Sequence, residues 1–128
     1  MAIQPKEAPM SNPVVHFEIH SSNAKDLNKY YSEMFGWHVN TDNEMGYGMV
    51  ETHAGKGIDG GISPQMGDEP NMVLFYVESD DIQASLDKAV ALGGKVFMPV
   101  TEMPMVTFAM FADPEGNVIG LVKGAAQA

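Results

Sequence analysis

The sequence of 128 residues contains no cysteine, few basic residues and no long apolar run, and each absence narrows the possible functions. Without cysteine the protein has no disulfide framework, no cysteine metal site and no thiol nucleophile. Its apolar runs are short, so none of them has the length that spans a membrane. Only 7 residues are Lys or Arg, against 17 Asp or Glu, and the net charge of −10 argues against binding to the phosphate backbone of nucleic acids.

The N-terminal segment, MAIQPKEAPMSNP, has no apolar core of the signal-peptide type, so we expect a cytoplasmic protein. Residues 1–12 contain two prolines and no apolar pattern, which predicts an N-terminal tail, and residues 124–128 form a C-terminal tail. The length in between is that of one domain. A domain of this size buries roughly two-thirds of its unfolded surface and needs no disulfide or structural metal to be stable. The net negative charge aids solubility, and its electrostatic field favours cationic over anionic ligands.

Two similar stretches follow one another along the chain. Strand-like runs at Val14–Ser21 and Met72–Ser79 each lead into a helix-like run, and these helices end at Gly36 and at Gly93. Corresponding positions in the two stretches are 57 or 58 residues apart. A solenoid would need three or more repeats, so two copies indicate two halves of one domain, with a pseudo-twofold cleft between them.

Successive side chains of a strand lie on opposite faces, and in the first strand apolar and polar residues alternate in this way. In the first strand one face holds Val15, Phe17 and Ile19, and the other holds His16, Glu18 and His20. In the second strand one face holds Val73, Phe75 and Val77, and the other holds Met72, Leu74 and Tyr76. The caps expected for the helices are Ser22 or Asn23 for the first, and Ser79, Asp80 or Asp81 for the second. Further strands are expected at 37–40, 47–53, 57–63, 95–98, 106–112 and 117–122, with a lid or a plain loop at Pro99–Met105.

Five motifs occur in a characteristic order within residues 13–123: HFEI, YYSEMFGW, GIDGGI, DDIQASLDKAVALGGKV and ADPEGNVIGLV. In this order they resemble the vicinal oxygen chelate superfamily, which contains glyoxalase I, bleomycin resistance proteins and extradiol dioxygenases. The resemblance implies an α+β fold in which two βαβββ modules, at about 13–64 and 71–123, form one glyoxalase/bleomycin-resistance/dioxygenase-type domain. It also implies a homodimer and a small-molecule ligand.

Superfamily members that hold a metal take one ligand from the first strand and one from the last strand of each module. In this chain the corresponding positions are His16, Gly61, Met72 or Leu74, and Gly120. Only His16 suits a hard or borderline cation, and a site of the glyoxalase type needs at least three protein ligands. We therefore predict no metal cofactor, and we expect the two glycines to widen the cleft.

His16 and Glu18 are the candidate catalytic residues, because side chains two residues apart on a strand share a face and can share a ligand or a proton. The alternative is a half-buried polar pair bonded to water. Glu51 and His53 share a face of the third strand and are candidates for ligand binding. With His16 and Glu18 they would suit a transition metal in a non-standard site. His20 ends its strand, and we expect it to be solvated.

Candidates for ligand binding in the second half are Met72, Leu74 and Tyr76, all on one strand face. The Tyr76 phenol could donate a hydrogen bond to a ligand carbonyl or phenolate, or lie at the edge of the core. Aromatic residues on other strands could line a small-molecule site or fill the core, and these are Trp37, Tyr47, Phe108 and Phe111.

Three functions stay open from the sequence, and we favour the first. It is a metal-free protein that binds a small, partly aromatic or cationic molecule, as the resemblance to bleomycin resistance proteins implies. The second is a glyoxalase-like lyase or a dioxygenase with the non-standard metal site. The third is a metal-independent enzyme that uses His16 or Glu18 as a general base. Proteins with this fold have many different functions, so the residues of the site must indicate which of the three applies.

Overall fold

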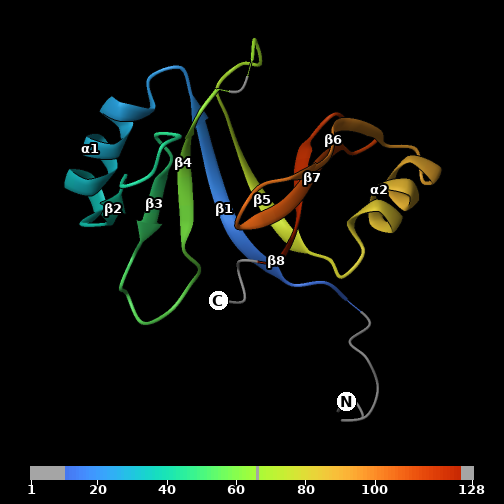
Figure 1. The fold of residues 1–128 in the computed structure, drawn as a ribbon, viewed down its shortest axis with the longest axis horizontal. Helices are drawn as coiled ribbons and strands as arrows, with labels where there is room; N and C mark the ends of the chain where they lie inside the picture. Colours follow the sequence, from blue (N-terminus) through green and yellow to red (C-terminus); the bar gives the residue numbers. More distant parts are fainter. Residues whose placement is uncertain (1–10, 66, 125–128) are drawn as a thin grey trace. The chain divides into compact units, whose positions relative to one another are not determined.

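The computed structural model describes residues 11–65 and 67–124, which form eight strands and two helices (Figure 1). The first series is β1 (Val14–Ser21), α1 (Ala24–Phe35), β2 (His38–Asn40), β3 (Gly48–Glu51) and β4 (Gly60–Pro64). The second series is β5 (Met72–Glu78), α2 (Ile82–Ala91), β6 (Lys95–Glu102), β7 (Val106–Ala112) and β8 (Val118–Gly124). The order βαβββ therefore occurs twice, which confirms the predicted α+β class and its two modules. Of the predicted tails at 1–12 and 124–128, residues 1–10 and 125–128 lie outside the described residues, whereas Gly124 belongs to β8 rather than to a tail.

Contacts divide the chain into two compact parts, Val15–Tyr76 and a second part that begins at Val77 and includes residues 11–14. The first part thus holds the first module and most of β5. Its strands follow the order β2-β3-β4-β1-β5, in which β5 lies beside β1. In the second part the strands follow the order β8-β7-β6.

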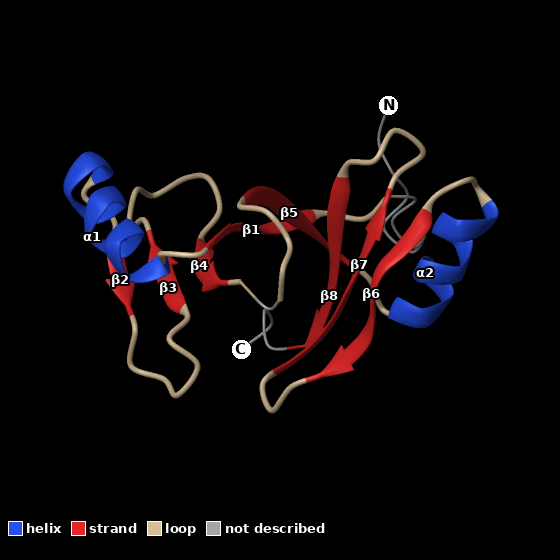
Figure 2. Ribbon diagram, turned by 90° about the horizontal axis from the view of Figure 1, so that it is seen from above, coloured by secondary structure: helices blue, strands red, loops and turns tan. Residues whose placement is uncertain are grey.

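In the part Val15–Tyr76, α1 covers one face of the strands. β1 and β4 are parallel, with Phe17 opposite Gly60, while β2, β3 and β4 are antiparallel neighbours. A parallel pair needs a long crossover, and α1, β2 and β3 supply it (Figure 2). The core beneath α1 contains Ala24, Val50 and Ile62, with Phe17 and Ile19 of β1 packed against it. This confirms the predicted apolar face of β1.

The ends of α1 follow the local sequence. Gly36 adopts the left-handed conformation, with φ of 73°, and its N–H donates to the Ser32 carbonyl at 2.9 Å. A residue with a Cβ would be strained there, so glycine ends the helix as predicted. Asn23 occupies the N-cap position, but its side chain donates to Asp26 at 2.8 Å rather than accepting from the helix backbone.

In the part that begins at Val77, α2 packs on the antiparallel strands β6, β7 and β8 (Figure 2). Asp81 caps α2, because its Oδ1 accepts from the Ala84 N–H at 3.0 Å. The core of this part consists of buried apolar residues from α2, β7 and β8: Ile82, Leu86, Ala109 and Leu121.

The prediction of a lid or a loop at Pro99–Met105 is wrong for its first four residues. β6 continues through Pro99 to Glu102, with register shifts against β7 between Met98 and Thr101. Pro99 cannot donate to a neighbouring strand, but an irregular strand at the end of the order β8-β7-β6 tolerates it. Within residues 11–65 and 67–124, neither helix has the length and apolar content needed to cross a membrane.

Candidate functional site

Glu18 lies at the centre of a buried hydrogen-bond network on the face of β1 opposite to α1. Its Oε1 accepts from the Tyr76 hydroxyl at 2.7 Å and from Nε2 of His20 at 2.5 Å. Its Oε2 accepts from the Tyr47 hydroxyl at 2.7 Å. The donors come from β1, from β5 and from the segment before β3. Three donors compensate a carboxylate that is only 7% exposed, since a buried charge without partners would be costly.

The ionisation states in the network follow from its contacts. Burial alone would raise the pKa of Glu18, but hydrogen bonds from His20, Tyr76 and Tyr47 outweigh burial and lower that pKa below its ordinary value. Glu18 is therefore a carboxylate at neutral pH and a weak base. Burial, together with the charge of Glu18 and the hydrogen bond to it, raises the pKa of both tyrosines, so both phenols remain protonated donors.

His16 is half-buried at the edge of this network. Its Nε2 lies 2.8 Å from the Tyr47 hydroxyl oxygen, and its ring meets the Tyr76 ring edge-on at a centroid distance of 5.7 Å. Burial lowers the pKa of His16, although the charges of Glu18 and Asp59 oppose this shift. The imidazole is therefore neutral at pH 7.

Tyr47 reaches the network because Gly61 has no side chain. Gly61 lies opposite Glu18 in the β1–β4 register, on the same face of the sheet. A Cβ built on Gly61 would overlap the hydroxyl oxygen and the Cζ of Tyr47. The expectation that glycine widens the site at this position is therefore wrong, because the Tyr47 phenol fills the space.

A turn that Asn43 organises brings Tyr47 to this position. The Asn43 side-chain oxygen accepts from the N–H groups of Met45 and Tyr47 at 3.1 and 3.0 Å. The Asn43 amide nitrogen donates to the Tyr47 carbonyl at 2.7 Å. Gly46 has a φ of 70°, which other residues rarely adopt. The turn fixes the backbone of Tyr47 and so directs its side chain toward Glu18.

Comparison with known families agrees with this fold. The family model described as a glyoxalase-like domain matches residues 14–122. The chain belongs to the glyoxalase-like domain family. This membership confirms the resemblance to the glyoxalase/bleomycin resistance/dioxygenase superfamily.

Curated relatives of this glyoxalase-like chain match over a shorter stretch. A protein of Mycobacterium tuberculosis (strain CDC 1551 / Oshkosh) named "Putative glyoxylase CFP32" is 35% identical over 71 residues, which cover 55% of the chain and 27% of that relative. A protein of the same name from Mycobacterium bovis matches equally. The matched stretch thus covers about a quarter of the length of these relatives.

Solved structures of low sequence identity share the fold. Methylmalonyl-CoA epimerase from Mycobacterium tuberculosis superposes with a TM-score of 0.61 at 12% identity, over 88% of this chain and 87% of that one. A glyoxalase/bleomycin resistance protein/dioxygenase superfamily member from Vibrio splendidus 12B01 gives a TM-score of 0.58 at 13% identity, over 88% and 99%. At these identities the similarity establishes the fold alone.

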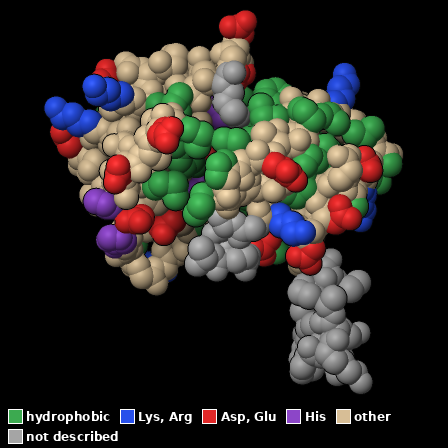
Figure 3. Space-filling model, in the orientation of Figure 1, with side chains coloured by type: hydrophobic (Ala, Val, Ile, Leu, Met, Phe, Trp, Pro, Cys, Tyr) green, Lys and Arg blue, Asp and Glu red, His purple; other side chains and the backbone are tan. Residues whose placement is uncertain are grey.

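Glu51 and His53 do not join His16 and Glu18 in this glyoxalase-like chain. Nε2 of His53 lies 3.4 Å from a Glu51 oxygen, and Nε2 of His38 lies 3.9 Å from the same oxygen. These three side chains are 45–70% exposed, and Figure 3 shows surface histidines beside acidic side chains. In the part of the chain that the structure describes, no group of three or more His, Asp or Glu side chains is placed to hold a metal ion.

His20 is not solvated, so that expectation is wrong. The residue is 1% exposed, its Nε2 bonds to Glu18, and its Nδ1 lies 4.0 Å from a Glu69 oxygen. One partner could be inferred from the sequence, because His20 lies two residues from Glu18 on the same strand face, but the proximity of Glu69 could not. On β5, Met72 is half-buried and Leu74 is 4% exposed.

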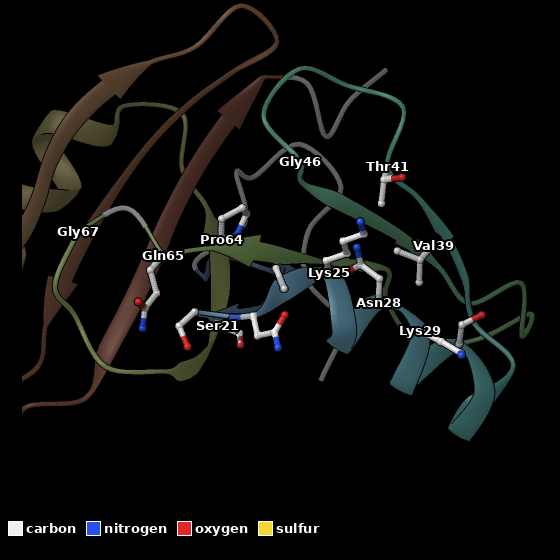
Figure 4. A pocket seen from close by; sticks show the side chains of 14 residues that line it. Ser21, Lys25, Asn28, Lys29, Val39, Thr41, Gly46, Pro64, Gln65 and Gly67 are labelled. Atoms are coloured by element: carbon white, nitrogen blue, oxygen red, sulfur yellow. Dashed lines mark hydrogen bonds between the residues drawn. The ribbon is translucent and has the colours of Figure 1, made fainter.

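A surface hollow of about 950 Å³ lies elsewhere in the same part of the chain (Figure 4). Its lining comes from α1 and the residues before it, from the end of β2 and from the segment after β4, and includes Lys25, Asn28, Thr41 and Gln65. None of the residues in the Glu18 network lines it. The hollow and the network are therefore separate features.

Proposed function

We propose that this glyoxalase-like protein binds a small molecule beside His16 without a metal ion. The position of Tyr47 carries the proposal. The superfamily pattern would place a metal ligand at residue 61, and here a neutral phenol fills that space and lies between His16 and Glu18. A phenol must lose its proton to bind a metal ion. The Tyr47 phenol stays protonated and donates a hydrogen bond to the Glu18 carboxylate.

The remaining positions of the superfamily pattern do not fit a metal either. Met72 and Leu74 offer no oxygen or nitrogen atom in their side chains, and Gly120 has no side chain. Both oxygens of Glu18 already accept hydrogen bonds. These residues suit hydrogen bonding and apolar contact with an organic molecule rather than a divalent cation.

A metal-independent enzyme is the second candidate, and the state of His16 favours it. A neutral, half-buried imidazole can act as a general base, and its lowered pKa keeps it neutral at physiological pH. Glu18 is the weaker candidate, because its lowered pKa and its three donors reduce its basicity. The name of the curated relatives, a glyoxylase, agrees with an enzyme. We retain a cytoplasmic homodimer as the expected state.

Metal analysis tests whether the protein lacks a bound metal ion. Protein purified without chelator is incubated with Ni²⁺, Zn²⁺, Fe²⁺ or Mn²⁺, dialysed, and analysed for metal per chain. We expect less than about 0.1 equivalent, as for a site weaker than roughly micromolar affinity, and no glyoxalase I activity. Near-stoichiometric metal binding that is lost in His16→Ala would contradict the proposal. His53→Ala is the control, because His53 lies in the exposed cluster with Glu51, and it should not change the result.

Ligand titrations test whether a small molecule binds beside His16. Titration with phenol and with benzylamine, followed by NMR, should shift the ring signals of His16 and Tyr76. His16→Ala should weaken binding by about 2- to 13-fold, which corresponds to one hydrogen bond of roughly 0.5–1.5 kcal/mol. His53→Ala is the matched control and should bind as the natural sequence does. Shifts confined to residues outside the Glu18 network would refute this location for the site.

A further inference from the structure

Glu18 determines where the phenol proton of Tyr47 lies. The two oxygens that face each other, Tyr47 Oη and Glu18 Oε2, are 2.7 Å apart. Two oxygen lone pairs at that distance would repel, so one proton must lie between them. Glu18 is a carboxylate that also accepts from Tyr76 and His20, and it carries no proton of its own. The Tyr47 hydroxyl therefore donates to Glu18.

The proton of Tyr47 in turn determines the tautomer of His16. A phenol has one proton, and that of Tyr47 is committed to Glu18. The contact of 2.8 Å between Tyr47 Oη and His16 Nε2 is a hydrogen bond only if the nitrogen donates. The neutral imidazole thus carries its proton on Nε2, and Nδ1 has a bare lone pair.

The Nδ1 atom of His16 has no hydrogen-bond partner in the described part of the chain, and the residue is only half-buried. Among the described residues, the fully buried side-chain atoms that lack a hydrogen-bond partner are His20 Nδ1 and Asn28 Oδ1. His16 Nδ1 is not one of them. An unpartnered polar atom on a half-buried side chain is available to accept a hydrogen bond from a ligand. His16 therefore presents an acceptor, and no N–H donor, to an incoming molecule.

We propose that His16 selects, through its Nδ1 lone pair, ligands that offer an O–H or N–H donor, and rejects ligands that offer only acceptors or an anionic group. This inference rests on the proposed function, since it names the chemistry of the ligand at the same site. The negative charges of Glu18 and Asp59 act on His16 in the same sense, because they favour a donor or a cation and oppose an anion.

The tautomer itself can be measured by long-range ¹H–¹⁵N NMR of the imidazole rings in metal-free protein, at a pH above the ordinary pKa of histidine. We expect the His16 signals to show a protonated Nε2 and a bare Nδ1. Tyr47→Phe removes the acceptor and should shift the ring toward a mixture of tautomers. Tyr30→Phe is the matched control, because Tyr30 is exposed and outside the network. A protonated Nδ1 in the natural sequence would overturn the inference.

The ligand preference is tested with probes that differ in one group. Phenol offers an O–H donor, whereas anisole has the same ring with a methyl ether in its place. Anisole should bind about 2- to 13-fold more weakly, the cost of one hydrogen bond, and benzoate more weakly than benzylamine. Equal or tighter binding of anisole would overturn the inference. Metal bound through His16 would refute the proposed function, yet leave the tautomer of the metal-free protein unchanged, so the two failures are distinguishable.

Discussion

The Tyr47 phenol occupies the space in which a side chain of residue 61 would lie, so the roles of Tyr47 and Gly61 depend on each other. Glycine at position 61 lets the hydroxyl lie 2.7 Å from Glu18 and 2.8 Å from His16. A neutral donor from the turn before β3 thus occupies the space of a side chain on β4.

Gly61→Ala should destabilise the protein by about 1–3 kcal/mol, the usual cost of inserting a methyl group into a packed site. The added Cβ overlaps the Tyr47 phenol, which must move and give up its contacts with Glu18 and His16. Urea unfolding measures the change in the free energy of unfolding.

The matched control combines Gly61→Ala with Tyr47→Ala. Once the phenol is gone the methyl group has room, so Gly61→Ala should cost much less in this background. We expect a coupling energy of about 1 kcal/mol or more between the two positions. Additive effects would mean that the overlap with Tyr47 is not what glycine avoids.

Local patterns predicted the elements and the orientation of β1. Alternation placed Phe17 on the helix-packing face and His16 with Glu18 on the other, and both assignments agree with the core beneath α1. Gly36 ends α1 because its positive φ is a local requirement that glycine meets. Such features depend on neighbours in the sequence, which is why the sequence alone predicts them.

Features that depend on distant residues were missed. His20 was expected to be solvated, because its position at a strand end says nothing of Glu69, 49 residues later, which lies 4.0 Å from its ring. Gly61 was expected to widen the cleft, but Tyr47 fills that space, and Tyr47 belongs to a turn whose direction the Asn43 side chain determines. Pro99 looked like a loop residue, and an irregular strand accommodates it instead.

Substitutions on the two faces of β1 should differ in cost. Phe17→Ala removes a ring that packs against Trp37 at a centroid distance of 5.4 Å and should cost about 3 kcal/mol or more. His16→Ala loses one hydrogen bond to Tyr47 and should cost about 1 kcal/mol. Thermal melts compare the two variants, and equal losses would show that His16 is a structural core residue.

The stability of the natural sequence should fall from about pH 8 to about pH 5 more steeply than that of His16→Gln. Burial lowers the pKa of His16 in the folded state below its ordinary value of 6.5. As the pH falls through 6.5 the unfolded chain takes up this proton first, so protonation favours unfolding. Melting temperatures of both proteins across this range supply the test. Parallel curves would mean that His16 titrates alike in the folded and unfolded states.

Glu18→Gln should destabilise the protein most at neutral pH and progressively less in acid. Its hydrogen bonds lower the pKa of Glu18 in the folded state below the ordinary value of 4.5, so the carboxylate adds stability above that value. This contribution is lost as the pH falls through the folded-state pKa. The glutamine amide presents donor hydrogens where Tyr47, Tyr76 and His20 also donate, so at least one hydrogen bond to a charged acceptor is lost, at a cost of roughly 1.5–3 kcal/mol. Urea unfolding at about pH 7 and about pH 4 measures the difference between the two proteins. A difference that does not shrink in acid would mean that the Glu18 charge adds nothing to stability and that shape alone explains the loss.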